Sequence, residues 1–110
     1  MNIFTEVNKG IIFLTFDGVF DNNSFNKFDK EINYLLYNQG ISYYSFNFNN
    51  VGLNDDVVPN IQNKLVEIFL NCGKVAMCGL NKKYQNKIGR GKDNLYYVKD
   101  EREVSKYLSL

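Results

Sequence analysis

The sequence predicts an α/β fold with a mostly parallel sheet and an antiparallel strand at its N-terminal edge. Short apolar stretches rich in β-branched and aromatic residues alternate with segments whose apolar residues recur at helical spacing. Such alternation is typical of parallel strands joined by crossover helices. The first two stretches are separated only by a short turn, which indicates a hairpin. The expected order is therefore β-β-α-β-α-β-α-β-α.

The length and composition set limits on the function. The 110 residues suffice for one core, and no linker, repeat or low-complexity tail interrupts them, so one domain is expected over residues 1–110. A formal net charge of +1 provides no global field that would attract nucleic acid or a membrane surface. Neither a membrane-spanning run nor a signal-peptide pattern is visible, so a cytoplasmic protein is expected.

The N-terminal hairpin is expected to comprise a short strand over residues 3–7, a glycine-containing turn over residues 8–10, and a strand over residues 11–16. The second strand is a near-continuous apolar run, Ile-Ile-Phe-Leu-Thr-Phe, which is typical of a strand buried on both faces. Residues 17–23 are expected to form a loop because they contain Asp, Gly and Asn.

The first helix is expected to begin after Asn23 or Ser24 as N-cap and to end at Gly40. The apolar residues along one face of it are Phe25, Phe28, Ile32, Leu35 and Leu36. A third strand is expected over residues 42–48, followed by a polar loop. The aromatic residues that share one face of this strand are Tyr44, Phe46 and Phe48.

The second helix is expected from about Asp56 to Asn71, with Pro59 in its first turn, where a missing N–H is harmless. Its apolar stripe consists of Val58, Ile61, Leu65, Ile68 and Phe69. The remaining elements are expected to be a strand over residues 74–78, a short helix over about 82–87, a strand over 95–98, and a final helix capped by Asp100 that carries Val104, Tyr107 and Leu108.

The chain has two cysteines and no histidine. Metal sites use closely spaced sets of Cys and His, and His is the commonest general base. Cys72, at the expected end of the second helix, and Cys78, inside a strand, are therefore interpreted as reduced structural thiols. No metal, no cofactor and no catalytic residue is expected.

Asp55 and Asp56 are the sharpest chemical feature. They follow the third strand at the start of a helix, and the carboxyl ends of parallel strands are where ligands and partners dock. One interpretation is an N-cap and a first-turn acid, which stabilise a helix by about 1 and about 0.3–1 kcal/mol respectively. The other is a recognition surface, and the two are compatible.

The basic stretch at residues 82–92 is a second candidate site. Residues 68–92 contain no Asp or Glu, and their cations are Lys74, Lys82, Lys83, Lys87, Arg90 and Lys92. The simpler interpretation is a solvated face, and the alternative is a docking patch for an acidic partner or an anion. A Walker phosphate loop is not matched, because Asn86 and Asp93 stand where Gly and Ser or Thr are required.

With this order of elements, the chain resembles the STAS domain family (sulphate transporter and anti-sigma factor antagonist) over nearly its whole length. Residues 16–24 resemble the family's second strand and its L-x-G-x-L-D exit, residues 46–51 resemble L-D-L-S-x-V, and residues 54–57 fall where the family has D-S-S-G or D-S-T-G. Residues 75–80 resemble its fourth strand, and residues 95–108 its last strand and helix.

In bacterial anti-sigma factor antagonists of this family, a partner kinase, the anti-sigma factor, phosphorylates the Ser or Thr before the motif's Gly, and the unphosphorylated form binds that partner. The resemblance places Asp56 at this position, with Asn54, Asp55 and Val57 around it and Asn47 in place of the third strand's Asp. No hydroxyl residue follows before the end of the second helix, so this switch is absent. Asp56 either mimics the phosphorylated form or meets a partner surface that accepts an acid.

The resemblance thus implies a non-enzymatic protein-interaction module of bacterial transcription regulation, in its most specific form a diverged anti-sigma factor antagonist without the phosphorylatable Ser. The expected recognition surface comprises Asp21, Asn22, Asn23, Leu53, Asn54, Asp55 and Asp56. The expected partner is a kinase-like anti-sigma factor, not nucleic acid or a membrane. The alternative is a small anion- or nucleotide-binding α/β domain that uses residues 82–92.

Overall fold

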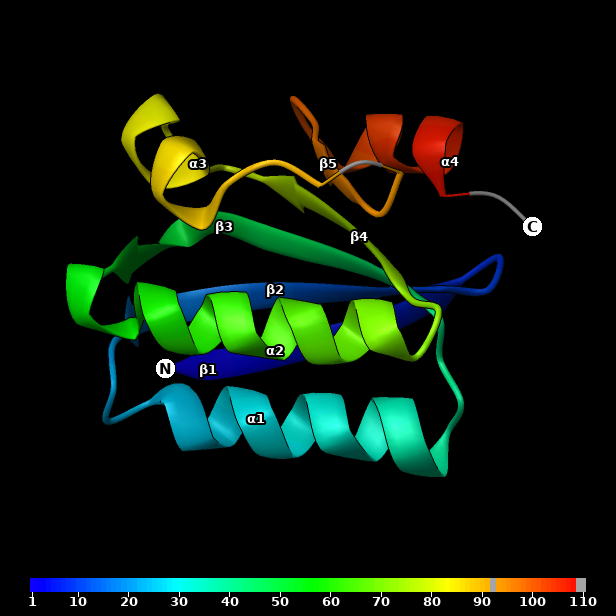
Figure 1. Cartoon of the computed structure of the whole chain (residues 1–110), viewed down its shortest axis with the longest axis horizontal. Coiled ribbons are helices and arrows are strands. Elements are labelled where there is room, and N and C mark those ends of the chain that lie inside the picture. Colours follow the sequence, from blue (N-terminus) through cyan, green and yellow to red (C-terminus); the bar gives the residue numbers. More distant parts are fainter. Residues whose placement is uncertain (92, 109–110) are drawn as a thin grey trace.

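The computed structural model of the chain describes residues 1–91 and 93–108. Its strands are β1 (Asn2–Asn8), β2 (Ile11–Phe20), β3 (Tyr43–Leu53), β4 (Lys74–Cys78) and β5 (Leu95–Tyr97). They lie in one sheet in the order β1-β2-β3-β4-β5 (Figure 1). β1 is antiparallel to β2, and each later neighbouring pair is parallel. The predicted fold class and antiparallel edge strand are confirmed.

The helices of the described chain are α1 (Phe25–Asn33), continued by a π-helical turn over Tyr34–Asn38; α2 (Val58–Leu70), preceded by a 3₁₀ turn over Asp55–Val57; α3 (Lys82–Ile88); and α4 (Val104–Tyr107), preceded by a 3₁₀ turn over Glu101–Glu103. The predicted order of strands and helices is therefore confirmed as well.

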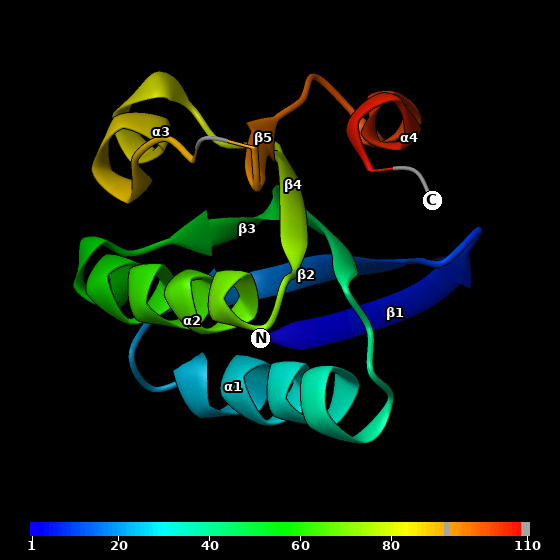
Figure 2. The same cartoon turned by 45° about the vertical axis from the view of Figure 1, so that its right-hand side comes forward.

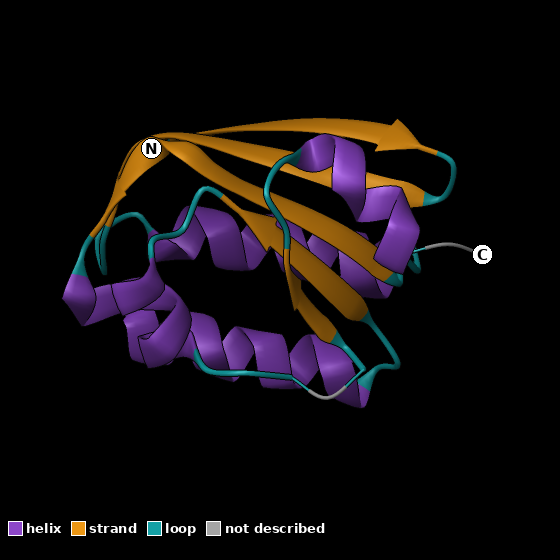
Figure 3. Cartoon of the chain, turned by 90° about the horizontal axis from the view of Figure 1, so that it is seen from above, coloured by secondary structure: helices purple, strands orange, loops and turns teal. Residues whose placement is uncertain are grey.

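The sheet is covered on both faces. The main apolar cluster fills the space between the sheet and the helices α1 and α2, and the end of α3 joins it. α4 lies on the other face of the sheet (Figure 3), and a smaller apolar cluster lies under it. The residues of this smaller cluster are Ile11, Ala76, Cys78, Val98, Val104 and Leu108. Adjacent residues of β2 are buried in different clusters, which explains its continuous apolar run.

β2 and β3 are both longer than the sequence predicts. Residues 17–20 and 50–53, which local propensity assigns to loops, pair with each other in parallel. The register shifts just before Asp17, as at a β-bulge, and Gly18 takes a φ of +111°. In this pairing, the backbone N–H and C=O groups of each segment find their partners in the other segment. The loop prediction was wrong because this long-range pairing overrides local turn signals.

α1 begins after a reciprocal pair of hydrogen bonds. Asp21 Oδ1 accepts from the Ser24 N–H at 3.0 Å, and Ser24 Oγ accepts from the Asp21 N–H at 2.9 Å. Ser24 precedes the helix as predicted, but its side chain makes no bond to the helix itself. Gly40 ends the helical segment, also as predicted, with a φ of +63°.

A buried lysine, which the sequence analysis missed, joins the two long helices. Lys64 of α2 is only 4% exposed. Its Nζ lies 2.7 Å from Asp29 Oδ1 of α1 and 3.3 Å from Glu67 Oε1, and it also donates to the Asn33 amide oxygen. Since buried charges require paired partners, these contacts fix how α1 and α2 lie against each other.

Candidate functional site

Three connections meet at the carboxyl edge of the parallel strands, on the left of Figure 1. They lead from β2 to α1, from β3 to α2, and from β4 to α3. The Asn54 N–H donates to the Phe20 carbonyl at 3.0 Å, and the Asn60 side chain donates to Asn22 Oδ1 at 2.8 Å. These two bonds hold the first two connections together. We call the partly or fully exposed residues 21–24 and 53–56, together with the adjoining side of α3, the carboxyl-edge surface.

Asp55 connects this helix start to α3. Its Oδ2 lies 3.0 Å from Lys87 Nζ, and its Oδ1 lies 3.7 Å from Lys83 Nζ. The Tyr84 hydroxyl lies 2.8 Å from Asp55 Oδ1 and 2.8 Å from the Leu53 carbonyl oxygen. Both lysine Nζ atoms also lie over the Tyr84 ring, at 5.2 and 5.8 Å from its centroid.

These contacts shift the pKa values of Asp55 and Tyr84. The Lys87 ammonium, followed by the Tyr84 hydroxyl, lowers the pKa of Asp55 below its usual range. The bond to Asp55 raises the pKa of Tyr84. Asp55 is therefore an internal ionic contact of the surface at neutral pH. Because its folded-state pKa is lowered, this contact is complete above the usual Asp pKa and is lost as the pH falls through the lowered value.

The two candidate sites of the sequence analysis thus meet at Asp55. Asp55 and two lysines of the basic stretch lie some 30 residues apart in the chain, and the fold brings them into contact. The sequence shows that the two segments carry opposite charges, which favours a contact between them. It does not specify which acidic residue contacts which lysine. Lys92, also part of the basic stretch, lies outside the described residues.

Asp56 differs from Asp55 in having no such contact. Its side chain is exposed, and within the described residues no hydrogen bond or ion pair engages its carboxylate. Neither Asp55 nor Asp56 caps α2 through its side chain, because the 3₁₀ turn intervenes and the N-cap positions make no side-chain bond. The N-cap interpretation was wrong, and both acids lie in the 3₁₀ turn that precedes α2, not in the first turn of α2 itself.

The other polar residues predicted for the recognition surface fall into two groups: those with side-chain hydrogen bonds inside the chain, and those with none among the described residues. The Asp21 carboxylate accepts a hydrogen bond from the Ser24 N–H, and the Asn22 side chain accepts one from the Asn60 side chain. Asn23 and Asn54 are exposed, and within the described residues no side-chain hydrogen bond engages them. Among the predicted residues, the polar side chains without a contact in the described chain are therefore those of Asn23, Asn54 and Asp56.

A shallow hollow of about 260 Å³ lies beside Asp55. Its lining residues are Phe48, Val51, Leu53, Gly79, Leu80, Asn81 and Tyr84. Gly79 takes a φ of +85°, and a Cβ there would lie 2.6 Å from the Asn49 nitrogen. Only glycine lets β4 turn into α3 this close to β3.

The buried polar groups next to the surface are structural. Asn47 is buried; its amide donates to Glu101 Oε1 at 3.1 Å and accepts from the Asn49 N–H at 2.9 Å. Burial, together with the charges of Glu101 and Asp100, raises the pKa of the Cys78 thiol to about 11. This thiol is therefore protonated at neutral pH and is a poor nucleophile. Cys72 is exposed, and neither cysteine forms a disulfide.

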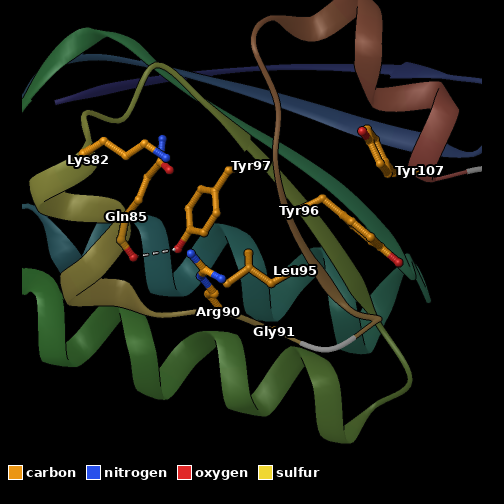
Figure 4. A pocket seen from close by; sticks show the side chains of 8 residues that line it. All are labelled: Lys82, Gln85, Arg90, Gly91, Leu95, Tyr96, Tyr97 and Tyr107. Atoms are coloured by element: carbon orange, nitrogen blue, oxygen red, sulfur yellow. Dashed lines mark hydrogen bonds between the residues drawn. The ribbon is translucent and has the colours of Figure 1, made fainter.

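A larger cavity, of about 360 Å³, lies between α3, β5 and α4 (Figure 4). Its lining residues are Lys82, Gln85, Arg90, Gly91, Leu95, Tyr96, Tyr97 and Tyr107. The Tyr97 hydroxyl donates to the Gly89 carbonyl at 2.6 Å, and Tyr96 stacks on Tyr107 with ring centroids 5.0 Å apart. Lys82 and Arg90 form no ion pair within the described residues.

Comparison with known proteins identifies the fold. No family model and no curated protein matches the sequence. Among solved structures, the anti-sigma factor antagonist SpoIIAA in its unphosphorylated form matches with a TM-score of 0.72 and 12% identity, covering 93% of this chain and 92% of that one. The Bacillus cell fate determinant SpoIIAA in its phosphorylated form matches with a TM-score of 0.72 and 14% identity, covering 96% and 98%. The chain adopts the STAS fold. At these identities the likeness concerns the fold alone.

Within residues 1–91 and 93–108, no group of three or more His, Cys, Asp or Glu side chains is arranged to hold a metal ion. No helix in this part of the chain is long and apolar enough to cross a membrane.

The ionic contact of Asp55 predicts a specific effect on its titration. In Lys87→Gln, the pKa of Asp55 is expected to rise, because the contact that lowers it most is removed. Lys82→Gln is the matched control, since Lys82 lies on the same helix and forms no ion pair with Asp55. Carboxyl chemical shifts followed by NMR across the acidic pH range measure both. An unchanged Asp55 pKa in Lys87→Gln would show that the contact does not form in solution.

Proposed function

We propose that this chain is a non-enzymatic protein-interaction module of bacterial regulation, which docks a protein partner on the carboxyl-edge surface. The proposal is supported by the STAS fold shared with an anti-sigma factor antagonist over nearly the whole chain. It is also supported by the surface itself, where loops after neighbouring parallel strands expose polar groups around a shallow hollow. In its specific form, the partner is a kinase-like anti-sigma factor in the cytoplasm.

The observation that carries the proposal is the contrast between the two acids of the helix start. Asp55 is neutralised by Lys83 and Lys87 within the chain, whereas the carboxylate of Asp56 is exposed and has no partner in the described residues. A carboxylate that is not needed for capping or for internal pairing is available for an external contact. We therefore propose that the partner places a cationic group opposite Asp56.

This site does not depend on phosphorylation in the proposed mechanism. Asp56 carries a constant charge at the position that the resemblance assigns to the phosphoacceptor, and residues 53–70 contain no Ser, Thr or Tyr that could replace it in the sequence. Binding is then controlled by the amount of protein and by ionic strength, because a charge contact at an exposed surface is screened by salt. Asp21, Asn22 and Leu53 act by holding the loops in place, and Asn23, Asn54 and Asp56 face the partner.

Charge reversal of Asp56 tests the proposal. Immobilised wild type is expected to retain one protein from a lysate of the cells that encode the chain, and Asp56→Lys is expected to lose it. Asp93→Lys is the matched control, because Asp93 is an exposed acid just before β5, at the opposite end of the sheet. Asp55 is left unchanged, since its reversal would also break contacts to α3. Equal retention by wild type and Asp56→Lys, or no specific retention, would contradict the proposal.

The cavity between α3, β5 and α4 favours a second candidate function, binding of a small anion or nucleotide. Lys82 and Arg90 line it together with three tyrosines, so it offers positive charge beside aromatic rings (Figure 4). A thermal-shift series with inorganic phosphate and with nucleotides tests this function, because a ligand that binds only the folded state raises Tm. A rise that is lost in Arg90→Gln would support the cavity, and no rise with any of these compounds would exclude it.

A further inference from the structure

The strand β1 forms an open edge of the sheet, as Figure 2 shows. It is seven residues long, contains no proline and carries a single charged residue, Glu6. Phe4 and Val7 are 59% and 62% exposed. Natural proteins protect edge strands with proline, bulges, covering loops or several charges. Apart from the single charge of Glu6, β1 has none of these protections among the described residues, so its backbone groups are available to another strand.

The hairpin fixes which residues of β1 direct their backbone groups outward. Lys9 and Gly10 alone join β1 to β2, since Asn8 pairs with Ile11, and both turn residues have positive φ, as in a type I′ turn. The pair that closes such a turn is hydrogen-bonded, and hydrogen-bonded and non-bonded pairs then alternate along the strands. The residues of β1 whose N–H and C=O groups point away from β2 are therefore Ile3, Thr5 and Val7.

The sequence of β1 is nearly symmetric about Thr5. It reads Asn-Ile-Phe-Thr-Glu-Val-Asn. If two copies pair antiparallel with a twofold axis at Thr5, the cross-strand pairs are Thr5 with Thr5, Ile3 with Val7, Phe4 with Glu6, and Asn2 with Asn8. Threonine pairs and pairs of β-branched residues stabilise neighbouring strands, and the two Glu6 carboxylates are not opposite each other. The three outward-facing residues also coincide with bonded positions in this register.

We propose that β1 is a homodimer interface, at which a second copy of this chain adds its own β1 to the sheet. We assign the partner strand to a second copy of this chain for two reasons. In the twofold register the side chains of β1 pair favourably with those of its own copy, and the outward backbone groups of the two strands are opposite each other. The pairing creates one continuous sheet through both copies. It lies at the lateral edge of the sheet, so the carboxyl-edge surface on the loops after β2, β3 and β4 stays open in each copy.

One strand pair buries less area than a standard stable interface, so the dimer is expected to form reversibly as concentration rises. Sedimentation equilibrium over a wide concentration range is expected to show a monomer–dimer equilibrium for wild type. Thr5→Lys is expected to weaken association at least tenfold, because it places two ammonium groups face to face on the axis. Glu6→Lys is the matched control, since residue 6 faces Phe4 of the other copy, and it is expected to dimerise like wild type.

Disulfide trapping tests the register itself. In a Cys72→Ser background, Thr5→Cys is expected to form a disulfide-linked dimer on mild oxidation, because bonded antiparallel pairs have Cα atoms about 5.5 Å apart, within the range of a disulfide. Glu6→Cys is expected to cross-link far less, since its two copies lie two positions apart. A wild type that stays monomeric at the highest concentration, or equal cross-linking by both variants, would overturn the proposal.

Discussion

Gly79→Ala is expected to destabilise the protein by about 2–5 kcal/mol. A positive φ costs a residue with a side chain about 1–2 kcal/mol, and overpacking against rigid neighbours adds about 1–3 kcal/mol. Here the neighbours are rigid, because a Cβ on Gly79 would lie 2.6 Å from the Asn49 nitrogen and 2.8 Å from the Phe48 carbonyl carbon, both backbone atoms. Urea unfolding measures the loss. The hollow beside Asp55 is expected to be disturbed as well, because Gly79 lines it.

Gly40→Ala is the control for this substitution. Gly40 also has a positive φ, +63°, but a Cβ there would meet nothing within 4 Å. Its expected cost is therefore the conformational part alone, about 1–2 kcal/mol. A Gly79→Ala variant no less stable than Gly40→Ala would show that β3 and the β4–α3 turn are not in close contact in solution.

Phe16→Ala is expected to cost about 3–5 kcal/mol, the usual loss for a fully buried phenylalanine. Phe16 is completely buried next to the bulge of β2. Its ring lies 5.2–5.8 Å, centroid to centroid, from the rings of four other residues: Phe20, Phe28, Phe46 and Phe48. Its removal leaves a cavity where β2, β3 and α1 meet. With a total stability of about 5–15 kcal/mol expected for a small domain, this is a large fraction.

Phe4→Ala provides the matched comparison in the same hairpin. Phe4 is 59% exposed, so its truncation is expected to change monomer stability by less than about 0.5 kcal/mol. Urea unfolding at low protein concentration, where association through β1 is minimal, measures both variants. Equal losses for Phe4→Ala and Phe16→Ala would contradict the described core.

The elements with strong local patterns were predicted well from the sequence. The strand at residues 74–78 has the predicted bounds, and the Asp100 cap and the Gly40 helix end are confirmed. Each depends on one residue's chemistry or on one continuous apolar run. The parallel pairing of β2 to β5 followed from the alternation of strands and helices, because parallel strands need crossover connections between them.

What the sequence could not provide were pairings between distant residues. The extensions of β2 and β3 exist only because residues 17–20 and 50–53 meet in space. From the sequence, Lys64 resembles an ordinary surface lysine of an amphipathic helix. It is buried instead, because Asp29 and Asn33 of α1 bind its ammonium group. Likewise, Asp55 appeared to be a cap or a recognition residue, whereas α3 neutralises it.

For the candidate site, the sequence predicted which loops lie together but not the contacts that their residues make. The loops after β2 and β3 do lie side by side, as expected for the carboxyl edge of a parallel sheet. The structure adds α3 to this surface and separates the seven predicted residues by what each one contacts. That Asn23, Asn54 and Asp56 bind a partner stays a proposal.

The affinity of the captured partner for single variants of Asp56 tests the central claim most directly. Calorimetry is expected to show binding to wild type that weakens as salt is added, binding at least tenfold weaker to Asp56→Lys, and a smaller loss for Asp56→Ser. Asp93→Lys is expected to bind like wild type. Unchanged binding by Asp56→Lys would place the interface elsewhere. Tighter binding by Asp56→Ser would show that Asp56 opposes docking, as a phosphate would, and would contradict a cationic group opposite it.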